Sequence, residues 1–424
     1  MQHGVAIIGA GWAGLSAALT LTEHAIPFTL YEASHQPGGR ARSVRLNGFS
    51  EPLDNGQHIL LGAYHQTLAL IQQVNPTPAW HRIPLELTMA GGLSLSVPPL
   101  PAPLHSLMAL LSAKGISWKE RRQALHFMWH WQRRRFSAPA SATVADLLAG
   151  QSGRLVRELW EPLCLATLNT PLNVASGQVF LNVLRDSLTR SRADSDLILP
   201  ACDLGALFPE PAIQYLTSRG QDIRPGTRIT RVARQGQGFL INSIFHDAVI
   251  CATAPWHAAT LVRQLDMPEL ADQLQAMGSH AIATVWLQYP ADLRLPRIMT
   301  GMTGTLAQWV FDRGQTHGQH GLIAVIISTA PAIGNAELAH QVSEELHHHL
   351  GLPVSPLQIR VICEQRATFS CTANQSRPGN VTGVPGWYLA GDYTASPYPA
   401  TLEAACQSGV QCAIHLLQRL HPEP

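Results

Sequence analysis

Three closely spaced glycines, Gly9, Gly11 and Gly14, constrain the fold of this chain more than any other feature. They follow Val5–Ile8, which has the pattern of a short buried strand, and precede an Ala- and Leu-rich helix expected over Leu15–His24. In such a strand–turn–helix, Gly9 permits the tight turn, Gly11 lets the backbone approach a pyrophosphate, and Gly14 lets the helix pack on the strand. The free N–H groups at the helix start, around Trp12 and Ala13, would face the phosphates. The segment therefore predicts a dinucleotide-binding, Rossmann-like unit.

The next expected strand, Phe28–Tyr31, ends at Glu32, where a carboxylate beside Ala33 can accept both ribose hydroxyls. The segment Gly38-Gly-Arg-Ala-Arg42 follows directly. It resembles the glycine–glycine–arginine loop of the flavin amine oxidase and phytoene desaturase superfamily. The resemblance implies that Gly39 and Arg40 lie along the pyrophosphate of FAD, so the dinucleotide is expected to be a flavin rather than a nicotinamide.

The C-terminal region resembles the second flavin motif of the same superfamily. An expected strand ends in Gly391-Asp392, and a helix is expected from about Thr401, with Leu402 in its first turn. Asp392 can bind hydroxyls of the ribityl chain or hydroxyls next to the phosphates, and the positive end of the helix dipole near Thr401 would favour an anionic reduced flavin. By the same resemblance, Val232 would lie beside the adenine.

These features predict an α/β fold with a discontinuous Rossmann-like FAD-binding domain and an inserted substrate domain of mixed sheet and helices. The FAD-binding domain is expected to comprise 1–75, 203–265 and 372–424. The block 76–202 is expected to be a helical region for substrate or membrane contact, including a helix over Leu155–Leu168. The block 266–371 is expected to be an α+β substrate-binding region, with strand-like runs at 281–287, 322–328 and 358–363 and a helix over 336–350.

The amino-acid composition limits the classes of ligand that are expected. Hydrophobic residues make up 46% of the chain and charged residues only 13%, which favours an apolar substrate. A net charge of +1 does not provide the basic surface that nucleic-acid binding requires, so no nucleic-acid partner is expected. No second glycine fingerprint is present, so electrons are expected to come from an unidentified donor rather than from a nicotinamide domain.

The sequence predicts no metal site, no membrane span and a cytoplasmic protein. The seven cysteines are dispersed without metal or redox spacing, and the histidines at 347–349 cannot share one helix face. Nothing at Met1–Gly4 resembles the head of a signal peptide, and glycines interrupt the apolar run that follows.

Residues 104–136 interleave Leu, Met, Trp and Phe with Lys and Arg. This pattern suits a helix pair at the surface of a membrane, and would place the protein on the inner face of the membrane. It equally suits two helices that pack their apolar sides on the core and expose a basic side to water. Both interpretations stay open.

Two further segments narrow the resemblance to one family. Asp54-Asn-Gly-Gln-His58 and Trp160–Pro171, together with Ser396–Glu403, resemble the hydroxysqualene dehydroxylases, also called squalene-associated FAD-dependent desaturases, of bacterial hopanoid biosynthesis. The resemblance implies that reduced FAD reductively removes an allylic hydroxyl from hydroxysqualene to give squalene. It also implies that Gly56, Gln57 and His58 lie against the flavin.

The implied reaction needs a proton donor for the leaving hydroxyl and an aromatic or negative surface for the allylic cation. His58, Glu161 and Asp54 are the candidate acids, with His58 preferred. Trp160, Tyr393 and Tyr398 are the candidate aromatic walls. Each has a structural alternative: His58 would only bind the flavin, Glu161 would cap a helix, and Trp160 would belong to the core.

Other functions fit less well. Amine oxidases of the superfamily typically place a lysine beside the flavin, whereas this chain has only Lys114 and Lys119, both in the helical block. A carotenoid desaturase or isomerase would share the apolar substrate and is the second hypothesis. A lipid-binding flavoprotein without catalytic activity is a third.

Overall fold

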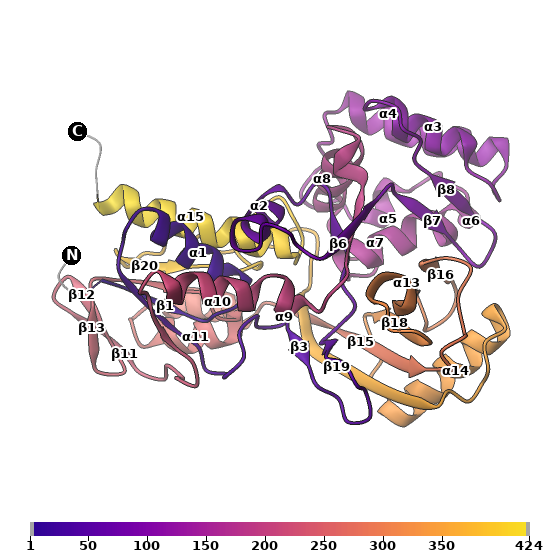
Figure 1. Cartoon of the computed structure of the whole chain (residues 1–424). Helices are drawn as coiled ribbons and strands as arrows, with labels where there is room; N and C mark the ends of the chain where they lie inside the picture. The colour runs from indigo at the N-terminus through magenta and orange to yellow at the C-terminus, as the bar shows by residue number, and fades with distance from the viewer. Residues whose placement is uncertain (1–3, 421–424) are drawn as a thin grey trace.

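A five-stranded parallel sheet has the N-terminal strand at its centre (Figure 1) in the computed structural model, which describes residues 4–420. Its strands lie in the order β10 (Asp222–Arg224), β2 (Phe28–Tyr31), β1 (Val5–Ile8), β14 (Ala248–Cys251) and β20 (Trp387–Leu389). β1 and β14 are buried along their whole length, as in a parallel sheet covered on both faces. The α/β class and the Rossmann-like unit predicted from the sequence are confirmed.

Alternate residues of β1 pack into two different cores. Val5 and Ile7 face a core shared with α1 (Trp12–Glu23), α10 (Pro209–Ser218) and α15 (Leu402–Leu420). Ala6 and Ile8 face the core that includes residues of α11 (Pro255–Arg263) and of the antiparallel strands β11 (Val232–Gln235) and β12 (Gly238–Ile241). A third antiparallel strand, β13 (Ile244–His246), pairs with β12. A last helix of this part, α12 (Pro268–Gln275), packs on α11.

Helices α1 and α15, from opposite ends of the chain, lie side by side (Figure 1). Gly409 of α15 makes this approach possible, because a Cβ there would collide with the carbonyl oxygen of Ala13. Each helix follows a strand of the parallel sheet, and parallel strands end at one edge. The N-termini of the two helices therefore meet at the same place.

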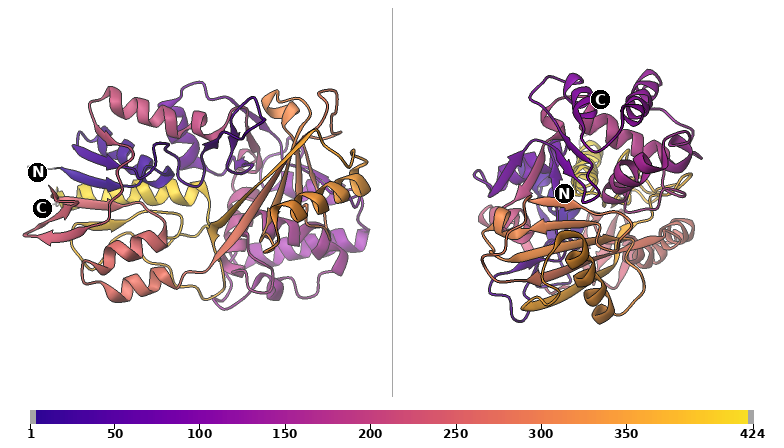
Figure 2. Two further views of the ribbon diagram at one scale, coloured as in Figure 1. Left: turned by 90° about the horizontal axis from the view of Figure 1, so that it is seen from below. Right: turned by 90° about the vertical axis from the view of Figure 1, so that its right-hand side faces the viewer.

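The block 266–371 forms an antiparallel sheet in the order β16 (Met299–Gly301), β17 (Trp309–Asp312), β18 (Leu322–Ser328), β15 (Ser279–Gln288) and β19 (Gln358–Phe369). Helix α14 (Asn335–Leu350) packs on one face through a separate core. The strands and the helix predicted here are confirmed. The other face of the sheet turns toward a layer of helices (Figures 1 and 2).

The block 76–202, predicted to be mainly helical after the proline-rich stretch Pro98–Pro103, begins with strands that precede this stretch. β6 (Trp80–Ile83) pairs with β9 (Leu197–Pro200), which also pairs with β5 (Leu60–Leu61), and β7 (Glu86–Thr88) pairs with β8 (Ser94–Ser96). Buried Leu87 and Leu95 lie opposite each other between more exposed neighbours, which is the alternation of a strand. The main helices of the block follow: α3 (Leu104–Ser112), α4 (Trp118–Arg133), α5 (Val144–Leu147), α6 (Gly153–Leu155), α7 (Glu161–Leu168) and α8 (Gly177–Leu188).

The helix predicted over Leu155–Leu168 contains a π-helical turn, Val156–Trp160, between α6 and α7. Pro162 follows it and has no N–H to donate to the preceding turn, which accounts for the local widening. The remaining short elements are α2 (His65–Val74), α9 (Leu204–Leu207), α13 (Arg313–His317), the 3₁₀ turn Ala193–Ser195, and the strand pair β3 (Ser43–Val44) and β4 (Leu53–Asp54).

Candidate active site

A continuous cavity of about 1260 Å³ runs from the edge of the parallel sheet to the space between the antiparallel sheet and the helical layer. A pocket for one small ligand usually measures roughly 300–1,000 Å³, so this cavity has room for more than one molecule. One end is lined by glycines and polar groups. The other end is lined by apolar side chains, among them Leu87, Leu110, Leu163, Phe180 and Phe311.

Two glycine segments form a wall without side chains at the polar end. Gly11 and Gly38 make a parallel bridge, and the N–H of Gly38 donates to the carbonyl of Ala10 at 2.8 Å. Gly9, with φ of 110°, turns the chain into the start of α1, where Trp12 and Ala13 also line the cavity. This backbone wall at a helix N-terminus suits a pyrophosphate.

Gly14 lies behind this wall and does not line the cavity. A Cβ at Gly14 would collide with the carbonyl oxygen of Gly9 and approach the Ala252 side chain at 3.2 Å. Gly14 therefore has the helix-packing role that its position in the motif predicts.

Glu32 ends β2 at the cavity, next to Ala33. Its carboxylate accepts hydrogen bonds from the backbone N–H groups of Ala10 at 2.7 Å and Ser34 at 2.8 Å. These two bonds hold the carboxylate beside the glycine turn, where a nucleotide ribose would lie.

Val232 does not line the cavity, contrary to the prediction that it contacts the adenine. It is buried at the start of β11, and its N–H donates to Gln264. The chain between β10 and β11 instead passes the cavity earlier, through Thr227–Thr230.

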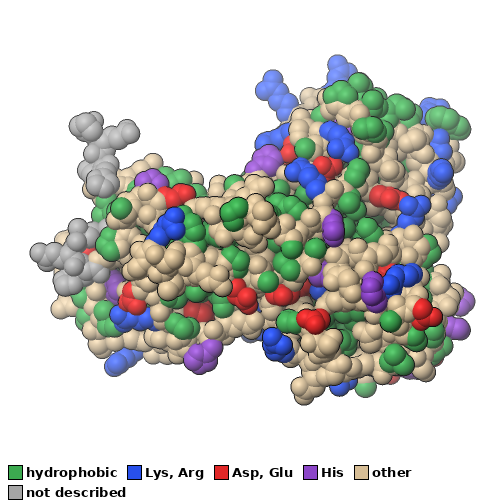
Figure 3. Space-filling view, in the orientation of Figure 1, with side chains coloured by type: hydrophobic (Ala, Val, Ile, Leu, Met, Phe, Trp, Pro, Cys, Tyr) green, Lys and Arg blue, Asp and Glu red, His purple; other side chains and the backbone are tan. Residues whose placement is uncertain are grey.

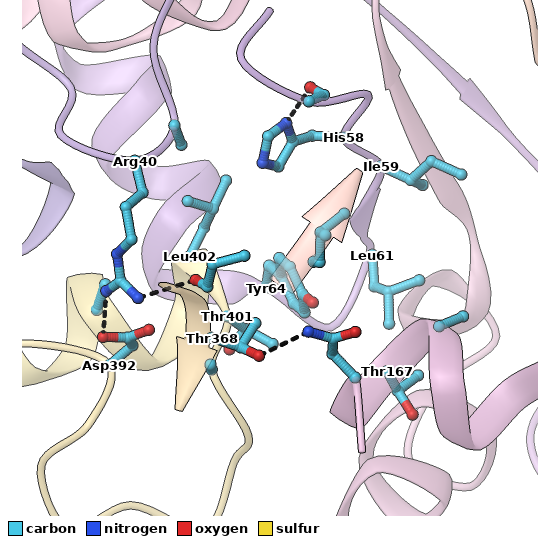
Figure 4. A pocket seen from close by; sticks show the side chains of 18 of the residues that line it. Arg40, His58, Ile59, Leu61, Tyr64, Thr167, Thr368, Asp392, Thr401 and Leu402 are labelled. Carbon is cyan, nitrogen blue, oxygen red and sulfur yellow. Dashed lines mark hydrogen bonds and ion pairs between the residues drawn. The ribbon is translucent and has the colours of Figure 1, made fainter. Parts of the chain in front are cut away.

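An ion pair joins the two flavin-like motifs. Arg40 donates to the Asp392 carboxylate at 2.6 Å and to the carbonyl of Ala367 at 2.9 Å (Figure 4). Arg40, Gly39, Gly391 and Asp392 all line the cavity. The pair brings together side chains from opposite ends of the sequence.

The N-terminus of α15 points to the same cavity. Thr401 caps the helix by accepting from the N–H of Ala404 at 3.1 Å, and Thr401 and Leu402 both line the cavity (Figure 4). Buried Glu403 accepts from the N–H of Thr67 at 2.9 Å and so ties this helix end to α2. A helix N-terminus carries positive dipole charge, which suits a ligand that becomes anionic.

His58 lies on a loop that lines the cavity with Gly56 and Gln57. Its Nδ1 lies 2.6 Å from the carbonyl oxygen of Gly56, so Nδ1 carries a hydrogen and donates (Figure 4). Burial lowers the pKa of His58, and nearby Asp54 opposes this only in part. The imidazole is therefore neutral at neutral pH, and protonation would place the added hydrogen on Nε2.

Asp54 lies on the side of this loop that faces the protein interior and does not line the cavity. One oxygen accepts from the N–H of Leu204 at 2.6 Å, and the other accepts from Arg313 at 3.2 Å. Arg313, which is also fully buried, donates to the side-chain oxygen of Gln57 at 2.9 Å. Asp54 was predicted as a candidate acid, but these bonds direct its carboxylate into the protein. Arg313 belongs to no sequence motif and was not predicted.

The other predicted side chains divide into two groups. Trp160 and Tyr393 are buried and line the cavity, whereas Glu161 and Tyr398 do not. Glu161 begins α7, and the next turn of that helix carries the cavity-lining side chains. The Tyr398 hydroxyl donates to Asp186 at 2.8 Å, and this bond holds the ring outside the cavity.

Tyr64 lines the cavity and was missed in the sequence, because it belongs to no motif and only precedes an unremarkable helix. No residue of the described chain, 4–420, hydrogen bonds with its hydroxyl. Burial, with a smaller contribution from Glu403, raises the pKa of Tyr64 well above its usual value. The structure thus adds a protonated hydroxyl group to the cavity (Figure 4).

Residues 12–417 match the family of flavin containing amine oxidoreductases, which is nearly the whole chain. The chain belongs to this family. The glycine wall, the Arg40–Asp392 pair and the start of α15 are positioned to hold a flavin dinucleotide, so the residues present fit FAD. The protein is an FAD-dependent oxidoreductase.

Individual relatives are similar to this chain in sequence, and solved structures are similar to it in fold. The chain is 28% identical to a hydroxysqualene dehydroxylase of Sinorhizobium fredii (97% of this chain, 98% of the relative) and 27% identical to one of Zymomonas mobilis (96% and 97%). A zeta-carotene desaturase of Solanum lycopersicum is 21% identical (97% and 80%). Among solved structures, an oxidoreductase from Methanosarcina mazei has the same fold, with a TM-score of 0.73 and 16% identity (97% and 99%).

Proposed function

We propose that this protein removes the allylic hydroxyl of hydroxysqualene and gives squalene, as a step toward hopanoids. Similarity to hydroxysqualene dehydroxylases over nearly the full length of both chains is the observation that carries this proposal. The hydroxyl leaves as water after gaining a proton, and a hydride replaces it on carbon. Bound FAD supplies that hydride when reduced, and an unidentified electron donor must reduce it again.

His58 is the proton donor in this proposal. Of the three acids predicted from the sequence, His58 lines the cavity, while Asp54 and Glu161 do not. The loop hydrogen bond from Nδ1 to Gly56 fixes the ring, so that Nε2 is the nitrogen available for proton transfer. Trp160 and Tyr393 line the cavity, and in this proposal they are the aromatic surfaces that stabilise the allylic cation.

The residues that line the cavity favour this proposal over amine oxidation. The two lysines of the chain, Lys114 and Lys119, are both exposed and lie outside the cavity, so no lysine can act beside the flavin. A carotenoid desaturase or isomerase is the second candidate function. The similarity to a zeta-carotene desaturase and the apolar end of the cavity favour it, although the identity is lower.

We further propose that the protein works on the inner face of a membrane, with residues 104–136 in contact with lipid. None of the described helices is long and apolar enough to cross a bilayer. However, α3 and α4 expose Leu104, Leu107, Met108, Trp118 and Trp129. Large apolar side chains on neighbouring surface helices, next to basic residues, are typical of an interfacial contact.

A substrate panel tests the reaction. The flavin is reduced anaerobically with dithionite, excess reductant is removed, and hydroxysqualene in detergent is added while flavin absorbance is followed. We expect reoxidation with formation of squalene, and no reoxidation with squalene itself as the control. The desaturase hypothesis replaces the proposal if the reduced flavin does not react, whereas phytoene bleaches the oxidised flavin. Bleaching by a primary amine would instead indicate an amine oxidase.

A further inference from the structure

Leu107 on α3 and Trp129 on α4 belong both to the protein surface and to the cavity wall. Both are exposed on the surface, with 41% and 51% of their area accessible, and both also line the cavity. Leu110, Leu125 and Met128, from the same two helices, line the cavity further in. The apolar end of the cavity therefore reaches the protein surface between α3 and α4.

This opening lies within an apolar surface. On α3, Leu104, Leu107 and Met108 have the spacing of one helix face, and all three are exposed. On α4, Trp118 and Trp129 are about three turns apart and share a face. Trp118 is 66% exposed and does not line the cavity. Large side chains thus surround the opening on both helices.

Basic side chains accompany these tryptophans. Arg121 stacks on Trp118 and Arg133 stacks on Trp129, with guanidinium carbons 4.7 and 4.8 Å from the ring centres. Lys114, Lys119, Arg122, Arg134 and Arg135 are also exposed. The one carboxylate of residues 104–136 is Glu120, which is buried in a capping box with Ser117. Blue side chains accordingly surround this part of the surface in Figure 3.

We propose that the opening between α3 and α4 faces the hydrocarbon of an anionic lipid bilayer, so that the apolar substrate enters the cavity directly from the membrane. The charge of the surface selects anionic lipid headgroups, and the exposed Leu, Met and Trp side chains reach past them. The route avoids transfer of a long apolar molecule through water, which is unfavourable. The identity of that molecule rests on the proposed function, but the route does not.

Vesicle binding tests the surface. The purified holoprotein should co-sediment with vesicles of phosphatidylcholine and phosphatidylglycerol, and much less with phosphatidylcholine alone. Arg122→Gln should weaken binding about fivefold, as expected for one basic residue near an anionic surface. Arg234→Gln, an exposed arginine on β11, is the matched control and should leave binding unchanged. Equal binding to the two kinds of vesicle would overturn the lipid assignment.

A pair of substitutions on α3 tests the opening. Leu107→Trp narrows the opening, whereas Leu104→Trp adds the same side chain to the same exposed face without lining the cavity. Both variants keep a large apolar side chain on the contact surface, and their transfer rates are compared at equal amounts of vesicle-bound protein. Transfer of radiolabelled squalene from vesicles to the protein should be several-fold slower for Leu107→Trp alone. Equal transfer rates in the two variants would overturn the route.

This transfer measurement does not depend on catalysis. If squalene enters through the opening but reduced flavin does not react with hydroxysqualene, the proposed reaction fails while the route stands. If the reaction proceeds and both variants take up squalene equally, the route fails while the reaction stands.

Discussion

At His58, one hydrogen bond decides which ring nitrogen is available to a substrate. Gly56 accepts from Nδ1, so a proton can be given only from Nε2 of the protonated ring. Because burial lowers the pKa of His58, this form is scarce at neutral pH and increases as the pH falls. We expect the single-turnover rate of flavin reoxidation to rise as the pH is lowered from neutral.

His58→Gln should remove this pH dependence and slow the step about 10²–10⁴-fold, the usual contribution of general acid catalysis. FAD content and the free energy of unfolding serve as controls for an intact fold. A native rate that does not change with pH would contradict the assignment of His58 as the acid.

Substitutions of Tyr64 and Tyr398 by Phe serve as a test and its control. Tyr64 presents its hydroxyl to the cavity, while Tyr398 binds Asp186 outside it. We expect Tyr64→Phe to reduce kcat with unchanged FAD content. Tyr398→Phe should retain kcat and lower the free energy of unfolding by about 1 kcal/mol, for one lost hydrogen bond. An interaction between the Tyr64 hydroxyl and the reacting substrate is contradicted if both variants turn over at the native rate.

Arg313 holds Asp54 and Gln57 together inside the protein. Arg313→Met leaves the buried Asp54 carboxylate without its cation, and we expect a loss of about 3–5 kcal/mol in the free energy of unfolding. Arg297→Met breaks a partly exposed pair with Glu86 and should cost about 0–1 kcal/mol. Chemical denaturation of the two holoproteins measures both values, and similar losses would contradict the structural role of Arg313.

At the scale of elements, Gly409 controls how closely α15 approaches α1. In Gly409→Ala the new Cβ meets backbone of α1 that cannot rotate away. We expect a loss of about 1–3 kcal/mol in stability, as for other overpacked sites, together with weaker FAD retention. Gly383→Ala, where a Cβ meets no atom within 4 Å, is the control. Unchanged FAD retention in Gly409→Ala would contradict the link between helix packing and the site.

Local sequence patterns predicted the elements whose residues depend on their immediate neighbours. The glycine turn, Glu32 and the strand before Gly391 follow short rules, and the structure has each where it was expected. The strands in residues 80–96 were missed, because each is only three or four residues long and one of them, β6, completes a sheet with distant β9. The π turn before Pro162 was also missed, since apolar spacing alone does not show where a missing N–H widens a helix.

At the scale of the whole molecule, the cavity forms where distant stretches of chain meet. The sequence indicated that Arg40 and Asp392 both belong to a flavin site, but only the fold shows that they pair. It could not show that Asp54 and Tyr398 face away from the cavity, because their partners Arg313 and Asp186 lie far away in the chain. The connection between the α3–α4 surface and the flavin end is likewise a property of the assembled fold.

Hydride transfer to the substrate is tested most directly by following isotopic hydrogen together with flavin absorbance. The protein is reduced in D₂O under anaerobic conditions, mixed with hydroxysqualene for a single turnover, and the product is analysed by mass spectrometry and NMR. We predict one squalene per oxidised flavin, with one deuterium on the carbon that carried the hydroxyl. Squalene without deuterium at that carbon, or a flavin that stays reduced in the presence of hydroxysqualene, would contradict hydride delivery to the allylic carbon.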